Sequence, residues 1–108
     1  MSRDYRDVSE ESVGEGKSIR WVIGRPEGAP NFSKLVAEFQ PGAVFETHHH
    51  PFEHEIFVLV GEGIAEGPDG EVPMRPGVAF YIPPDEPHGY RNVGQGVLRF
   101  ICVIPHQG

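Results

Sequence analysis

The sequence predicts an all-β fold, a sandwich or barrel of short strands built as one domain. The 108 residues are enough for one ordinary core, and 38% of them are hydrophobic, which excludes a disordered chain. Fourteen glycines and eleven prolines are spread along the chain in turn-like pairs. No segment sustains a helical period, because a glycine or proline every few residues would interrupt a helix.

The chain divides into a polar arm and a strand-rich body. Residues 1–18 are polar and lack periodicity, so we expect an N-terminal arm that is either loose or forms an edge strand at a dimer interface. Strand signals begin at residue 19, and the predicted barrel covers residues 19–108. No repeat, linker or second domain is visible.

Short β-type runs follow one another through the body, separated by turn residues. The first four runs cover residues 19–24 (IRWVIG), 32–39 (FSKLVAEF), 43–50 (AVFETHHH) and 55–63 (EIFVLVGEG). Residues 63–74 are typical of a hairpin with Pro68-Asp69-Gly70 at its turn. The last runs cover residues 77–85, 88–94 and 97–105. Seven to ten short strands in about 90 residues indicate a sandwich or a barrel.

Composition excludes several classes of function. Sixteen acidic residues against nine basic ones give a formal net charge of -7 without a basic cluster, so nucleic acid and anionic membranes are poor partners. The single cysteine, Cys102, rules out an internal disulfide and a cysteine-built zinc site. No apolar run is long enough to cross a bilayer and no signal peptide is visible, so we expect a cytoplasmic protein.

Four of the six histidines lie within seven positions, and they carry the chemistry. Because side chains alternate along a strand, His48 and His50 share a face and His49 points away. Glu46 and His54 have the same parity, although Pro51 bends the chain before His54. Imidazoles two residues apart on a strand can share one metal ion; the alternative is a solvent-exposed histidine-rich strand without function.

The spacing of these residues resembles the first motif of the cupin superfamily (RmlC-like), G-x5-H-x-H-x3-4-E-x6-G. Here Gly42, His48, His50 and Gly61 stand at the expected positions, and His54 replaces the usual glutamate. The resemblance implies a single-domain cupin, a double-stranded β-helix or jelly-roll barrel.

The second cupin motif, G-x5-P-x-G-x2-H-x3-N, is matched from Gly77 to Asn92. Pro83, His88 and Asn92 are in place, and Asp85 replaces the second glycine. The chain is most similar to small four-histidine manganese cupins of thermophilic bacteria. That likeness implies one divalent metal ion held by His48, His50, His54 and His88.

The resemblance favours manganese, then iron, with nickel, copper, cobalt or zinc as other occupants. All-imidazole sites are otherwise typical of zinc, copper, iron and nickel. The resemblance also implies that Phe100 and Cys102 line the metal pocket; a small buried core residue is the other interpretation of Cys102. Glu46 is either a hydrogen-bond partner of the site or a solvated rim carboxylate.

Other side chains also receive candidate roles. Tyr90 and Arg91, next to His88, are candidates for gating or binding a substrate. Trp21 and Tyr81 are interpreted as packing residues, and His106 as a solvated surface residue.

Three functions remain open at this stage. The first is a small metal-dependent oxidoreductase, dioxygenase- or peroxidase-like, acting on a small organic substrate. The second is a non-catalytic metal-bearing module that binds or senses a small ligand. The third is a cupin isomerase or epimerase, which the intact ligand set disfavours. We expect a small-molecule ligand and a homodimer, which would also hide edge strands.

Overall fold

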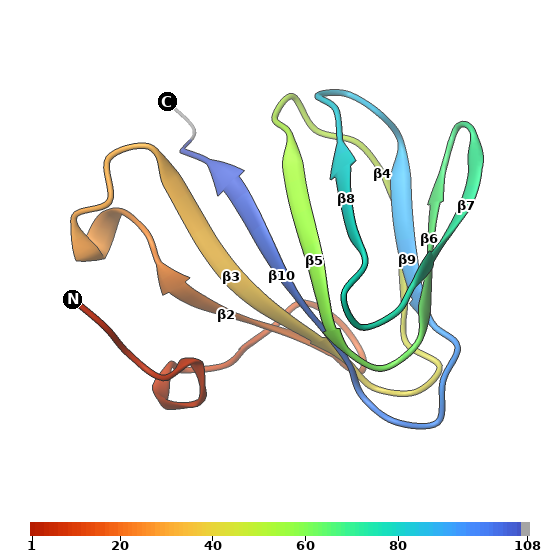
Figure 1. Ribbon diagram of the computed structural model, residues 1–108, viewed down its shortest axis with the longest axis horizontal. Helices are drawn as coiled ribbons and strands as arrows, with labels where there is room; N and C mark the ends of the chain where they lie inside the picture. Colours follow the sequence, from red (N-terminus) through yellow and green to blue (C-terminus); the bar gives the residue numbers. More distant parts are fainter. Residues whose placement is uncertain (107–108) are drawn as a thin grey trace.

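A computed structural model describes residues 1–106 as two antiparallel β-sheets that face each other (Figure 1). The first sheet has six strands, in spatial order β1 (Glu11–Ser12), β2 (Lys17–Ile23), β3 (Phe32–Phe39), β10 (Leu98–Pro105), β5 (His54–Val60) and β8 (Ala79–Ile82). The second has four, in the order β4 (Val44–His48), β9 (His88–Asn92), β6 (Gly63–Gly67) and β7 (Gly70–Met74). The all-β prediction is confirmed.

Two 3-10 turns, η1 (Tyr5–Asp7) and η2 (Arg25–Glu27), are the only helical elements among residues 1–106. Within that range no helix has the length and apolar character needed to cross a bilayer. The N-terminal arm contains η1 and β1, and β1 pairs with β2 of the same chain. The role of the arm at a dimer interface stays a prediction.

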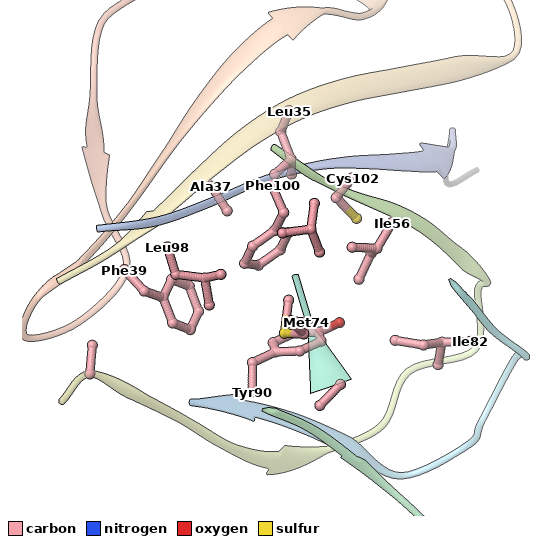
Figure 2. Close-up of a cluster of buried hydrophobic side chains, with 13 residues drawn as sticks. Leu35, Ala37, Phe39, Ile56, Met74, Ile82, Tyr90, Leu98, Phe100 and Cys102 are labelled. Atoms are coloured by element: carbon pink, nitrogen blue, oxygen red, sulfur yellow. The ribbon is translucent and has the colours of Figure 1, made fainter. Parts of the chain in front are cut away.

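The core lies between the two sheets because the strands alternate inward and outward residues. On β10 the inward residues are Leu98, Phe100 and Cys102, each at most 3% exposed. Figure 2 shows Phe100 and Cys102 from β10 and Tyr90 from β9 pointing into the space between the sheets. Both sheets therefore contribute inward side chains to one buried cluster.

The predicted hairpin is confirmed: β6 pairs with β7, and Gly67 faces Gly70 across the turn. The strand predicted over residues 43–50 is shorter than expected. β4 ends at His48, and His49 and His50 belong to the loop before Pro51. The strand predicted over residues 55–63 begins at His54, so His54 lies in the other sheet.

Two residues of the second motif have structural roles. Asn92 is buried; its amide donates to the carbonyl oxygens of Phe39 and Gly96 and accepts from the amide of Gly94. Asp85 has a φ of 66°, in the left-handed region that glycine adopts without strain. This explains why a glycine is usual at that position and why aspartate, which tolerates the region better than most residues, can replace it.

Candidate metal centre

The histidines meet at one end of the space between the sheets. The ligand atoms of His48, His50 and His88 all lie within 4.8 Å of one another. His48 and His88 face each other across the β4–β9 ladder, with ring centroids 4.4 Å apart. His50 approaches from the loop, and its ring centroid lies 4.8 Å from that of His88. Three imidazoles distant in sequence therefore converge on one point.

Gly89 allows the two strands of this ladder to approach closely. A Cβ atom at this position would lie 2.9 Å from the carbonyl oxygen of Phe45 and 3.1 Å from the amide nitrogen of Thr47. A side chain at residue 89 would therefore push β4 away from β9. The backbone amide of Asp85 donates to the carbonyl oxygen of His50 at 2.8 Å and so ties the His50 loop to the loop before His88.

Three of the rings are oriented by backbone carbonyl oxygens. The Nδ1 atoms of His48, His50 and His88 lie 2.8–3.0 Å from the carbonyl oxygens of Glu46, Phe52 and Glu86. A carbonyl oxygen only accepts, so Nδ1 carries the proton in each ring and Nε2 has a free lone pair. This is the tautomer that an Nε2 metal ligand requires.

His54 lies beside this cluster but is not one of the three converging residues. Its ring stacks on that of His50 with a centroid separation of 4.3 Å, and it lies 5.5 Å from the ring of His88. Its Nδ1 atom lies 3.0 Å from the Sγ atom of Cys102. The role of His54 as a fourth ligand stays a prediction.

Burial favours the neutral form of His54 and His88. Burial, together with the neighbouring His50, His88 and His48, lowers the pKa of His54 to about 3. Burial also lowers the pKa of His88 and outweighs the hydrogen bond to the carbonyl oxygen of Glu86, which raises it. Neutral imidazole is the form that binds metal ions.

The donor set fits a divalent metal ion. Among residues 1–106, the Nε2 atoms of His50, His54 and His88 are buried without a hydrogen-bond partner. A buried polar atom of this kind is costly unless it has a partner, and two of the three belong to the converging group, which indicates a shared partner for that group. A divalent ion bound by neutral imidazoles would supply it.

A cavity of about 400 Å³ opens onto the histidines. His48, His50 and His54 form its polar end, and most of its remaining wall is apolar: Val13, Ile19, Trp21, Leu35, Phe39, Phe45, Phe52, Phe100 and Ile104. None of the described residues that line it is Asp, Glu, Lys or Arg. The cavity therefore suits an apolar molecule that reaches the histidines with one polar end.

Phe100, Cys102 and Tyr90 line this cavity. Both interpretations of Cys102 apply: the residue is only 3% exposed, as a core residue is, and its thiol contacts His54. Burial raises the pKa of Cys102 to about 12. The hydroxyl of Tyr90 is buried without a partner in the described chain, and burial raises its pKa well above the usual range.

Glu46 lies outside the cavity. The β4–β9 register shifts between Phe45 and His48, so these two residues both face inward although they are three apart. Counting parity along β4 therefore misplaces the carboxylate of Glu46, which is exposed. Only its carbonyl oxygen contacts His48.

Other assignments from the sequence need correction. Trp21 is 43% exposed and lines the cavity, and Tyr81 is 55% exposed. Arg91 forms ion pairs with Glu66 and Glu71 and does not line the cavity. His106 is partly buried, with both ring nitrogens shielded and without a partner among residues 1–106.

Sequence reasoning missed the aromatic wall around the histidines. The ring of Phe52 stacks on that of His50 at 4.2 Å, and the ring of Phe45 lies 4.5 Å from that of His48. Both phenylalanines lie within three positions of a motif histidine. That proximity was the signal available in the sequence.

Comparison with known proteins agrees with this geometry. Residues 35–104 match the family model described as the cupin domain. The chain is 32% identical over 100 residues to an oxalate-binding protein of Thermotoga maritima, covering 90% of this chain and 83% of that protein.

Two further similar proteins belong to polyketide biosynthesis by name. The structure of the polyketide cyclase RemF from Streptomyces resistomycificus superposes with a TM-score of 0.91 at 33% identity, covering 99% of this chain and 80% of that one. The polyketide synthase CurC of Streptomyces cyaneus is 40% identical over 76 residues. That match covers 68% of this chain and 49% of that protein, so the chain spans about half the length of CurC. On the family match and the Thermotoga relative, this chain belongs to the cupin family.

Proposed function

We propose that this cupin is a metal-dependent enzyme that binds an apolar, carbonyl-bearing molecule and promotes its cyclisation. The observation that carries the proposal is a 400 Å³ cavity with aromatic and aliphatic walls that ends on a histidine cluster. A cavity of this size matches a drug-sized organic molecule rather than a small dianion. The similarity to a polyketide cyclase supports the same class of substrate.

The metal ligands in this proposal are His48, His50 and His88, with His54 as the fourth. When bound, a divalent metal ion supplies Lewis-acid polarisation of a carbonyl oxygen. Manganese, then iron, remains the prediction for the native ion, and elemental analysis of untagged protein tests it. The histidines themselves supply oriented nitrogen donors, because backbone carbonyls hold three of the four rings.

Tyr90 is the proposed donor to the substrate. Its hydroxyl is buried without a partner, on a residue that lines the cavity next to His88. Because its raised pKa keeps the hydroxyl protonated, it can donate a hydrogen bond to a substrate oxygen. The phenylalanines around the histidines exclude water and offer faces on which an aromatic molecule can stack.

Oxalate binding is the second candidate, favoured by the Thermotoga relative. Within the described lining no lysine or arginine could accompany a dianion, and the apolar walls would be left without a contact. The oxidative reaction expected from the sequence has no specific support among the similar proteins named above, so oxygen consumption belongs in the same experiment.

The test compares two probes on the metal-loaded protein, benzoylacetone and oxalate, by calorimetry. We expect benzoylacetone to bind more tightly. Tyr90→Phe should weaken it by about 1 kcal/mol, or about 5-fold, since one neutral hydrogen bond is lost. Tight oxalate binding with no diketone binding would overturn the proposal in favour of a binding module.

Turnover is tested with a linear aromatic triketone, using mass spectrometry and an oxygen electrode. Loss of one water without oxygen uptake supports cyclisation. Oxygen uptake coupled to substrate loss would instead establish the oxidoreductase. An unchanged triketone, on a protein that binds it, would leave a binding protein.

The homodimer also remains a proposal. Phe57 and Tyr81 are 45% and 55% exposed on neighbouring strands of the six-stranded sheet, and both line an apolar groove there. A second copy packed on this face would cover them. Light scattering of wild type and Phe57→Glu measures this, with a monomeric variant expected.

A further inference from the structure

The four histidines are not held in the same way. Backbone carbonyl oxygens hold the Nδ1 atoms of His48, His50 and His88, whereas the Nδ1 atom of His54 contacts a side chain, the Sγ atom of Cys102, at 3.0 Å. A point substitution removes a side-chain partner but leaves a backbone carbonyl in place. Among the four rings, His54 is therefore the one whose Nδ1 hydrogen bond depends on the identity of another residue.

The partner also affects the tautomer. A carbonyl oxygen fixes the proton on Nδ1, but a thiol can either donate its proton to Nδ1 or accept one from it. Only the second arrangement leaves the Nε2 lone pair free for a metal ion. The tautomer of His54 is thus open until something binds Nε2, whereas the tautomers of the other three rings are already fixed.

Position in the fold separates His54 as well. It begins β5 in the six-stranded sheet, while His48 and His88 lie in the four-stranded sheet. The converging group consists of His48, His50 and His88. The Nε2 atom of His54 is nevertheless buried without a partner among the described residues, close to the stacked ring of His50.

We propose that the metal centre is a three-plus-one site, in which Cys102 is the positioning residue that makes His54 a ligand. His48, His50 and His88 form a preformed group of three ligands. His54 completes the site only in the tautomer in which its Nδ1–H donates to the sulfur of Cys102. The inference rests on the metal site proposed above, but not on the substrate or the reaction.

Affinity for Mn²⁺ and Co²⁺, measured without substrate, provides the test. The variants are Cys102→Ala, Cys102→Ser, His54→Ala and the double variant with alanine at both positions. Cys102→Ala should weaken metal binding by about 10- to 100-fold, as is typical when the partner of a ligand histidine is lost. Cys102→Ser keeps a donor and an acceptor, so it should stay within about 3-fold of wild type.

The double variant separates positioning from packing. Because Cys102 acts through His54, the double variant should bind metal no more weakly than His54→Ala alone. Pulsed EPR on the Mn²⁺ protein adds a spectroscopic readout, with one fewer coordinated nitrogen in Cys102→Ala than in wild type. Val58→Ala is the matched control, since Val58 is fully buried, faces the core from β5 and does not line the cavity.

Several results would overturn the inference. Equal metal affinity in wild type and Cys102→Ala would remove the positioning role. Additive losses in the double variant, or an equal loss in Val58→Ala, would assign the effect of Cys102 to packing. If wild type bound no divalent ion, the metal site in the proposed function would fail as well. Normal metal binding with no effect of Cys102 would sink this inference alone.

Discussion

The interior cavity and the outer face of the six-stranded sheet both carry groups that can be charged, but they satisfy them differently. Inside, three imidazole nitrogens are buried without a partner in the described chain. Outside, Glu38 on β3 pairs with Arg99 at 2.8 Å and with Arg20 at 3.4 Å. The ring of Tyr5, from the N-terminal arm, covers both arginines at 5.6 and 6.0 Å.

The difference suggests that the outer face stabilises the fold, whereas the fold bears the cost of the histidine cluster. On the outer face, Arg20 also pairs with Glu10 of the arm, so these charged side chains connect the arm to the sheet. The histidines leave their Nε2 atoms unpartnered, which lowers stability unless something from outside binds them. Their cost to the fold is the physical argument that they are kept for function.

The largest expected effect comes from removing two of the three preformed ligands. In His48→Ala/His88→Ala, metal binding should be lost, because two of the three converging donors are gone. A saturating divalent ion should then no longer raise the stability of the variant, whereas about 2.7 kcal/mol is expected for wild type at 100 times the Kd. Elemental analysis and thermal unfolding of untagged protein measure both quantities, and His49→Ala, an exposed neighbour, is the control.

Lowering the pH should destabilise the protein through the buried His54. The pKa of His54 falls from 6.5 in the unfolded chain to about 3 in the fold, so between these values only the unfolded chain binds the proton. The free energy of unfolding of the metal-free protein should therefore decrease as the pH falls below 6.5. The slope is at most about 1.4 kcal/mol per pH unit for this group, reduced by solvent screening.

His54→Gln removes this proton linkage while keeping a polar side chain. Denaturant unfolding of both proteins between pH 7 and pH 4 gives the measurement, and the stability of the variant should depend less on pH. Parallel curves for the two proteins would mean that His54 is not shielded as the structure indicates.

The sequence was sufficient to predict the short strands and their succession along the chain, but not the exact geometry of their pairing. Alternation places Phe100 and Cys102 on one face of β10, and both residues are buried there. The same rule failed on β4, where the register shift puts Phe45 and His48 on one face. A bulge changes the parity of every residue beyond it, and no feature of the local sequence predicted this bulge.

Convergence of His48, His50 and His88 was predictable from the motif spacing, whereas the hydrogen-bond partners of the histidines were not. The contact between His54 and Cys102 joins residues 48 positions apart and depends on how β5 and β10 are aligned. Likewise, the arm could be recognised as polar, but its charge network depends on a sheet face that only folding assembles. Long-range register is the part that a single sequence leaves open.

A smaller effect is expected on the outer face. Glu38→Gln removes the carboxylate that Arg20 and Arg99 share. The loss is costly because the two arginine side chains are only 19% and 24% exposed. We expect a loss of about 1–3 kcal/mol in the free energy of unfolding, measured with denaturant. Metal affinity should not change; a tenfold weaker affinity would show that the two regions are coupled through β3.

The smallest effect should come from the arm itself. Tyr5→Leu keeps an apolar side chain but removes the ring over the two guanidinium groups, for an expected loss of about 0.5–1 kcal/mol. Because Arg20 also donates to the carbonyl oxygens of Arg6 and Val8, the arm should loosen before the barrel unfolds. Hydrogen exchange of residues 4–12 against β3 measures this: faster exchange in the arm alone supports a docked arm with its own stability. Uniformly faster exchange would mean that the arm and the barrel unfold as one unit. The outer face and the cavity would then differ in how their polar groups are paired, but not in local stability.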